Sequence, residues 1–216
     1  MSTDKVPAAA LLCSDPVEVA PRLLGATITS RSRDGKDVTI RLTEVEAYRG
    51  ESDPGSHAFR GRTARNASMF ETAGTVYVYF TYGMHHCVNL VCWPEDRAGA
   101  VLLRGGEVIK GLDLARTRRP AARADRDLAR GPARLCAALG LTRSDDGIRL
   151  GSEGDRLRLV LPEPGEAPKL QQLRSGPRTG VAGPGGDARH FPWRFWLDGE
   201  TTVSAYRPAV KRPRTR

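Results

Sequence analysis

The stretch Val38–Tyr48, VTIRLTEVEAY, carries the clearest fold signal in this sequence. Its apolar and polar residues alternate with a period of two, which is the pattern of a β-strand with one buried face. One face holds Val38, Ile40, Leu42, Glu44, Glu46 and Tyr48, and the opposite face holds Thr39, Arg41 and Thr43. We therefore predict a strand whose core-facing stripe runs directly into two carboxylates and a tyrosine.

The segments on either side of this strand predict its immediate neighbours. Leu23–Ser30 is rich in β-forming residues, and the Asp34-Gly35 turn that follows predicts an antiparallel connection into the strand. The segment Arg49–Ala73 after the strand is long and polar. A connection of this length within a compact domain is usually functional.

A second β-rich region predicts a hairpin. Thr75–Tyr82 (TVYVYFTY) is followed by Gly83 and then by His85–Trp93, so Tyr82 falls at the predicted tip. Tyr77 and Tyr79 share one face of the strand, and Tyr82 falls on the other face. Tyrosines are common in half-buried sheets, so ordinary packing explains the pattern. The alternative is a stacking platform for nucleic-acid bases.

The remaining segments indicate an α+β domain. They predict a short strand over Ala100–Arg104, helices over Val108–Arg119 and Pro132–Leu139, a Pro- and Gly-rich run over Pro162–Pro192, and a last strand over Trp193–Leu197. We expect a single domain over residues 1–206, with a mixed, mostly antiparallel sheet, a protruding hairpin and a few surrounding helices. Residues 207–216 form a basic tail that we expect to be disordered.

Composition narrows the class of partner. The chain has 216 residues and a net charge of +9, which favours a polyanionic partner such as nucleic acid.

No uncharged apolar run approaches the roughly 20 residues of a membrane span. The four cysteines form no C-x-x-C pair, so we expect reduced thiols in a cytoplasmic protein. The P-loop, G-x-G-x-x-G and G-x-S-x-G motifs are all missing from the sequence, which argues against nucleotide-cofactor chemistry and a hydrolase elbow.

Glu46 is the first candidate for chemistry. Glu44 and Glu46 are either surface carboxylates on an edge strand or groups at the mouth of an apolar pocket, where a carboxylate can act as a general base. His85 and His86 stand near two cysteines, but adjacent residues on a regular strand point to opposite faces. We therefore expect no metal site there.

Several motifs closely resemble the alkyladenine, or 3-methyladenine, DNA glycosylase family. They are Glu44–Gly50 (EVEAYRG), Ser56–Asn66 (SHAFRGRTARN), Met69-Phe70, Thr75–Asn89 (TVYVYFTYGMHHCVN), Ala100–Arg104 (AVLLR), Gly131–Leu139 (GPARLCAAL) and Arg178–Val181 (RTGV). The motifs occur in family order over about Leu23 to Ser204. The resemblance implies a small, mostly β domain that flips a damaged base out of duplex DNA and cleaves its N-glycosidic bond.

The resemblance also implies roles for individual residues. Glu46 would be the general base that activates water, and Arg104 would hold that water and the carboxylate. Tyr48 would stack on one face of the flipped base, with His57 and Tyr79 on the other. Tyr82 would wedge into the DNA stack, and Asn89 would exclude guanine through its extra amino group. Whether His85 contacts the base stays open.

The resemblance, with the sequence, implies a monofunctional enzyme without a cofactor. The five lysines lie outside the pocket motifs, whereas a glycosylase that also nicks DNA needs an amine nucleophile. We expect a monomer that acts on double-stranded DNA containing a damaged purine, in the cytoplasm or, in a bacterium, on the nucleoid. Two alternatives remain: a catalytically silent protein that binds damaged DNA, and a metal-dependent nuclease that uses Glu44, Glu46 and His57.

Overall fold

The computed structural model describes residues 8–81, 83–94, 96–151 and 156–209. Its elements are the helices α1 (Ala8–Leu12), α2 (Pro16–Arg22), α3 (Leu112–Arg118) and α4 (Pro132–Leu139), and the strands β1 (Thr27–Arg31), β2 (Asp37–Tyr48), β3 (Val76–Thr81), β4 (His85–Val91), β5 (Ala100–Lys110), β6 (Leu157–Val160), β7 (Leu173–Gly176) and β8 (Arg194–Leu197). Short 3₁₀ turns lie in the connections. No helix in these described ranges is long and apolar enough to cross a membrane.

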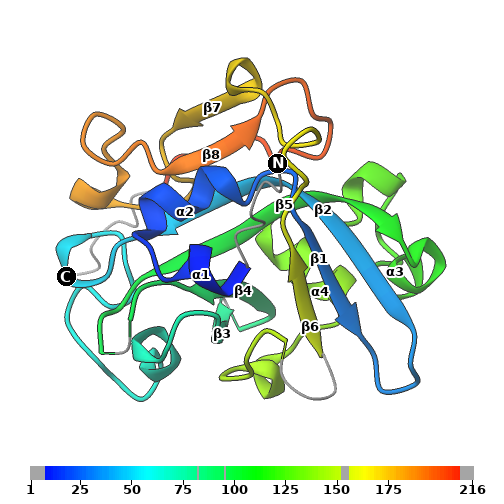
Figure 1. Cartoon of the computed structure of the whole chain (residues 1–216), viewed down its shortest axis with the longest axis horizontal. Helices are drawn as coiled ribbons and strands as arrows, with labels where there is room; N and C mark the ends of the chain where they lie inside the picture. The colour runs from blue at the N-terminus through cyan, green and yellow to red at the C-terminus, as the bar shows by residue number, and fades with distance from the viewer. Residues whose placement is uncertain (1–7, 82, 95, 152–155, 210–216) are drawn as a thin grey trace, which may run out of the picture.

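The strands form one sheet in the order β3-β4-β5-β2-β1-β6, and β8 pairs with both β2 and β7. Every strand pairing within the described part of the chain is antiparallel. Helices α1 and α2 lie in front of the sheet in Figure 1, and α4 lies behind it. The predicted α+β class with a mostly antiparallel sheet is therefore confirmed.

Strands β3 and β4 form the predicted hairpin, which lies at one edge of the sheet. Its register runs from Val76 opposite Leu90 to Thr81 opposite His85. Met84, next to the turn, is exposed. Tyr82, the predicted tip residue, lies outside the described residues.

Helix α4 begins and ends where its sequence predicts. Pro132 occupies the first turn, where its missing N–H costs no hydrogen bond. Gly140 follows the last residue with a φ of 68°, a left-handed conformation that glycine adopts without a Cβ clash. The buried face of α4 packs against β4 and β5. This packing fixes the end of the helix near the cavity described below.

The strand over Val38–Tyr48 differs from the prediction in one respect. Val38, Ile40 and Leu42 join the core, but the next core positions are Val45 and Ala47. The buried apolar positions therefore change from even to odd numbers. The change coincides with irregular pairing between β2 and β5 on both sides of Glu44. The expected unbroken stripe is wrong, because such an irregularity re-aims the side chains that follow it.

Two other element boundaries were also predicted wrongly. The expected strand from Leu23 begins only at Thr27, because Leu23 caps helix α2. The expected short strand over Ala100–Arg104 continues to Lys110 as β5, and the expected helix from Val108 begins only at Leu112, because Val108 still pairs with Ile40 of β2. In both places, residues that local propensity assigns to one element belong instead to a helix cap or to a sheet pairing.

Candidate active site

A cavity of about 470 Å³ opens among β2, β3, β4, β5 and the N-terminal end of α4. Five of the residues chosen from the sequence line it: Tyr48, His57, Tyr79, Asn89 and Arg104. Other lining residues include Gly55, Met69, Tyr77, Cys87, Leu102, Pro132, Thr179 and Val181. Segments far apart in the chain therefore converge on one concave site of the size that small-molecule and base pockets have.

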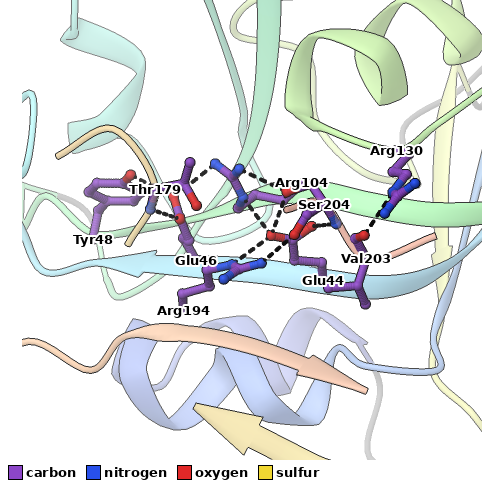
Figure 2. Close-up of polar contacts among 9 residues, drawn as sticks. All are labelled: Glu44, Glu46, Tyr48, Arg104, Arg130, Thr179, Arg194, Val203 and Ser204. Carbon is purple, nitrogen blue, oxygen red and sulfur yellow. Dashed lines mark hydrogen bonds and ion pairs between the residues drawn. The ribbon is translucent and has the colours of Figure 1, made fainter. Parts of the chain in front are cut away.

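Glu46 is a fully buried carboxylate bonded to two of the lining side chains. Its Oε2 accepts a hydrogen bond from the Tyr48 hydroxyl at 2.8 Å and from Arg104 Nη1 at 3.4 Å. Its Oε1 accepts the Thr179 backbone N–H at 2.7 Å. Figure 2 shows Glu46 held between these groups at one end of a longer polar network. The carboxylate thus has a defined orientation beside the cavity.

Glu44, the second carboxylate of the strand, forms the other end of that network (Figure 2). Arg104 Nε and Arg194 Nε both donate to its Oε1, at 2.9 and 2.7 Å. Burial opposes ionisation of Glu44, but the charges of Arg104 and Arg194 outweigh it and lower the pKa of this carboxyl. The negative charges of Glu46 and Glu44 in turn raise the pKa of Arg104, although burial lowers it. Glu44 is therefore a fixed anion that anchors Arg104, rather than a surface carboxylate.

Aromatic rings form the walls of the cavity. Tyr77 and Tyr79 are stacked with centroids 5.6 Å apart, and His57 meets Tyr79 edge-on at 4.6 Å. His57 Nδ1 lies 3.1 Å from the Tyr77 hydroxyl. Burial raises the pKa values of Tyr48 and Tyr79, and burial together with the charge of Arg65 lowers the pKa of His57. These rings therefore present neutral faces to the cavity.

Asn89 lies on β4 at the back of the cavity. Its side-chain Nδ2 donates to the Tyr77 backbone carbonyl at 3.1 Å, and the residue is buried. Asn89 also lies opposite Leu102 in the β4–β5 pairing. The amide is therefore held rigidly by two strands while its residue still lines the cavity. His85, left open by the sequence, lines the cavity as well.

Another wall of the cavity comes from residues 179–182, which follow Arg178 within the Pro- and Gly-rich run. Arg178 is fully buried and forms two hydrogen bonds with Asp53, from Nη1 to Oδ2 at 2.6 Å and from Nη2 to Oδ1 at 2.7 Å. Its guanidinium also lies over the Tyr48 ring, 4.6 Å from the centroid. The same guanidinium bonds to the Ala47 and Gly185 carbonyls. A single buried ion pair therefore ties the strand, the long connection and this wall together.

Sequence reasoning did not single out Arg178 and Asp53 as a pair. Both residues stood in recognisable contexts, the RTGV motif and the Asp53-Pro54-Gly55 turn. The pattern carries no signal that these two charges meet, because 125 positions separate them. The wall also needs a glycine at position 55, since a Cβ there would lie 2.4 Å from Arg178 Nη2.

The long connection is organised by Asn66. Its Oδ1 accepts the Thr63 N–H at 2.6 Å, and its Nδ2 donates to the carbonyls of His57 and Gly61 at 2.9 and 3.1 Å. These bonds are local, so they stabilise a compact loop without a strand or helix. The connection places His57 at the cavity, and its functional role stays a prediction.

The proposed ligands of a metal-dependent nuclease are not assembled. Glu44 is bonded to two arginines, and His57 faces Tyr77 and Tyr79. Across the part of the chain that the structure describes, no three His, Cys, Asp or Glu side chains are grouped so that they could hold a metal ion.

The comparisons with known proteins agree with this geometry. A family model described as methylpurine-DNA glycosylase matches residues 10–201. The chain belongs to the methylpurine-DNA glycosylase family. It is thus a DNA glycosylase, a hydrolase acting on N-glycosyl bonds, and damaged DNA is its partner. The suspected family is therefore confirmed.

Curated relatives match nearly the whole of this glycosylase. A protein of Streptomyces avermitilis is 54% identical over 98% of this chain and 97% of its own. Relatives from Leifsonia xyli subsp. xyli and Nocardia farcinica are 53% and 49% identical, and cover 88% and 94% of this chain and 88% and 92% of their own. Each carries the name "Putative 3-methyladenine DNA glycosylase".

Proposed function

We propose that this glycosylase removes alkylated or deaminated purines from duplex DNA and leaves an abasic site, which initiates base excision repair. The substrate class comprises 3-methyladenine, hypoxanthine and ethenoadenine. The names of the relatives support the first of these substrates. The observation that carries the proposal is the buried Glu46 carboxylate, bonded to Arg104 and Tyr48, which both line an aromatic-walled cavity.

In this mechanism Glu46 acts as the general base. Loss of the base leaves an oxocarbenium-like sugar, and a carboxylate beside the anomeric carbon stabilises that charge while it deprotonates the attacking water. Arg104 holds the water and the carboxylate. Hydrogen bonds from Tyr48 and Thr179 keep the carboxylate oriented, so that little reorganisation is needed during the reaction. An N-alkylated purine is already cationic and leaves with little acid assistance.

The aromatic walls are proposed to hold the flipped base. Tyr48 would stack on one face of the base, with His57 and Tyr79 on the other. Flipping costs a few kcal/mol, least for a damaged or weakly paired base, and stacking in the cavity offsets this cost. Tyr82 would fill the space that the base leaves in the duplex. Asn89 would clash with the extra amino group of guanine and so protect normal guanine.

The glycosylase is proposed to be monofunctional and monomeric. None of the lysines in the described ranges lines the cavity, so none of these amines is placed there to attack the sugar. A covalent enzyme–DNA adduct trapped with borohydride would contradict this. The net charge of +9 suits a duplex DNA partner. We place its action in the cytoplasm, on the nucleoid of a bacterium.

The decisive experiment measures base release from defined duplexes. Duplex oligonucleotides carrying hypoxanthine or 3-methyladenine are incubated with the enzyme, and abasic product is revealed by alkaline cleavage. Wild type should give product, and Glu46→Gln should lose at least about a hundredfold in rate, since it removes the general base. Glu18→Gln, an exposed carboxylate on α2, is the matched control and should keep full activity.

Two results would overturn this proposal. Wild-type protein that binds the damaged duplex without releasing a base would favour the silent binding protein instead. Full activity in Glu46→Gln would remove the general base from the mechanism while leaving the family assignment intact.

A further inference from the structure

A C-terminal segment, Val203–Arg207, closes over the polar network behind the cavity. We call it the C-terminal strap. The Val203 carbonyl accepts a hydrogen bond from Arg130 Nε at 2.9 Å, and the Arg207 carbonyl accepts the Gly180 N–H at 2.9 Å. Arg207, the first residue of the expected basic tail, is therefore bonded to the cavity wall, whereas residues 210–216 of that tail lie outside the described residues. Gly180 itself lines the cavity. The strap therefore connects Arg130, two residues before α4, to the cavity wall, and it lies beyond the match to the family model, which ends at residue 201.

Ser204 is the residue of the strap that enters the network. Its backbone N–H donates to Glu44 Oε2 at 2.7 Å, and its hydroxyl donates to Glu44 Oε1 at 2.9 Å. The same hydroxyl accepts a hydrogen bond from Arg104 Nη2 at 3.1 Å. Arg194 Nη2 donates to the Ser204 carbonyl at 2.7 Å. Figure 2 shows Ser204 between Glu44 and Arg104.

These contacts determine how Arg104 faces Glu46. The Nε of Arg104 is bound by Glu44, its Nη2 by Ser204, and its Nη1 by Glu46. A guanidinium is planar, so two anchors on one edge fix the direction in which the third nitrogen points. The bond from Nη1 to Glu46, at 3.4 Å, is the longest of the three. The two shorter bonds, to Glu44 and Ser204, therefore hold Arg104 in place. They determine the geometry of the longer bond to Glu46.

We propose that Ser204 is a positioning residue of the glycosylase and that the C-terminal strap completes the active site. The hydroxyl of Ser204 orients Arg104, and Arg104 in turn orients the Glu46 carboxylate and its water. This inference rests on the proposed role of Glu46 as general base. A site held less rigidly loses rate rather than substrate affinity, because a misplaced group fails to reach the reactive geometry without changing the stacking of the base.

The test compares three variants of the full-length protein. Ser204→Ala removes the hydroxyl and keeps the backbone N–H to Glu44. Ser204→Thr restores a hydroxyl at the same position. Thr202→Val is the matched control, because it breaks a buried hydroxyl contact of the same chain segment, from Thr202 Oγ1 to Thr43 Oγ1 at 2.8 Å, without touching Arg104.

Two quantities are measured for each variant. One is the single-turnover rate of hypoxanthine release, and the other is the affinity for a duplex that carries a tetrahydrofuran abasic analogue. Ser204→Ala removes the hydroxyl's bonds to both Arg104 and Glu44, and should lower the rate about tenfold through the loss of the bond that orients Arg104, with affinity changed less than about twofold. Ser204→Thr should recover most of the rate. Thr202→Val should lower the melting temperature without lowering the rate.

Each outcome decides the inference. It is overturned if Ser204→Ala keeps the wild-type rate, if it loses affinity instead of rate, or if Thr202→Val loses the rate equally, which would indicate general loosening of the segment. The proposed function fails in a different way, through wild-type protein that releases no damaged base at all.

Discussion

Removing the Asp53 carboxylate should destabilise the whole protein and not only the cavity wall. Asp53 is fully buried and accepts four hydrogen bonds: two from Arg178, at 2.6 and 2.7 Å, and two from the backbone N–H groups of Arg49 and Gly55, at 3.1 and 2.8 Å. In Asp53→Ala the Arg178 guanidinium stays buried without a counter-charge. Breaking a buried ion pair by removing one partner costs about 3–5 kcal/mol of unfolding free energy.

An exposed ion pair of similar geometry provides the control. Arg116 contacts Asp125 through two hydrogen bonds, at 3.0 and 2.9 Å, but both side chains are exposed. Water solvates either charge when its partner is lost, so Asp125→Ala should change the unfolding free energy far less. The two ion pairs have similar hydrogen-bond geometry and differ in burial, and Asp53 additionally accepts two backbone N–H groups.

The assay is urea unfolding of wild type, Asp53→Ala and Asp125→Ala, followed by far-UV circular dichroism. A double variant, Asp53→Ala with Arg178→Met, should recover part of the stability that Asp53→Ala loses, because it removes the unpaired buried charge. Equal effects of Asp53→Ala and Asp125→Ala would refute the reasoning. The reasoning would also be refuted if the double variant had a lower unfolding free energy than Asp53→Ala, by the full cost of a second buried substitution.

Three further predictions concern the cavity. Gly55→Ala should cost about 1–3 kcal/mol and slow base release, since its Cβ would meet Arg178 Nη2 at 2.4 Å; circular dichroism and the cleavage assay check this. His57 should titrate below its ordinary pKa of 6.5 by NMR, because burial and Arg65 lower it, and Arg65→Ala should raise that pKa. The neutral ring of His57 therefore makes its full contribution to stability when the pH is above the ordinary pKa of 6.5. This contribution is lost as the pH falls through the lower pKa of His57 in the folded protein. Incubation with EDTA should leave the rate of base release unchanged, whereas inhibition would favour the metal-dependent nuclease.

Local sequence determined much of the framework. The alternation of Val38 to Leu42, the hairpin around Gly83 and the Gly-Pro start and Gly stop of α4 are each written within a few neighbouring residues. Such signals act through local sterics and through which face of a strand or helix is apolar, so they survive without knowledge of the rest of the chain. The motif resemblance added the candidate residues, five of which line the cavity.

The environment of those residues was decided only by the tertiary structure. Alternation placed Glu44 and Glu46 on one apolar stripe, but the irregular pairing around Glu44 moved the core to odd positions. The bond between Ser204 and Arg104 joins residues 100 positions apart, and no local pattern specifies such a contact. Which charges meet depends on how the strands are ordered and on where the chain returns. Sequence by itself therefore named the carboxylate, Arg104 and the aromatic rings, and the fold supplied the contacts of Arg178 and Arg194, the wall and the strap that hold them in place.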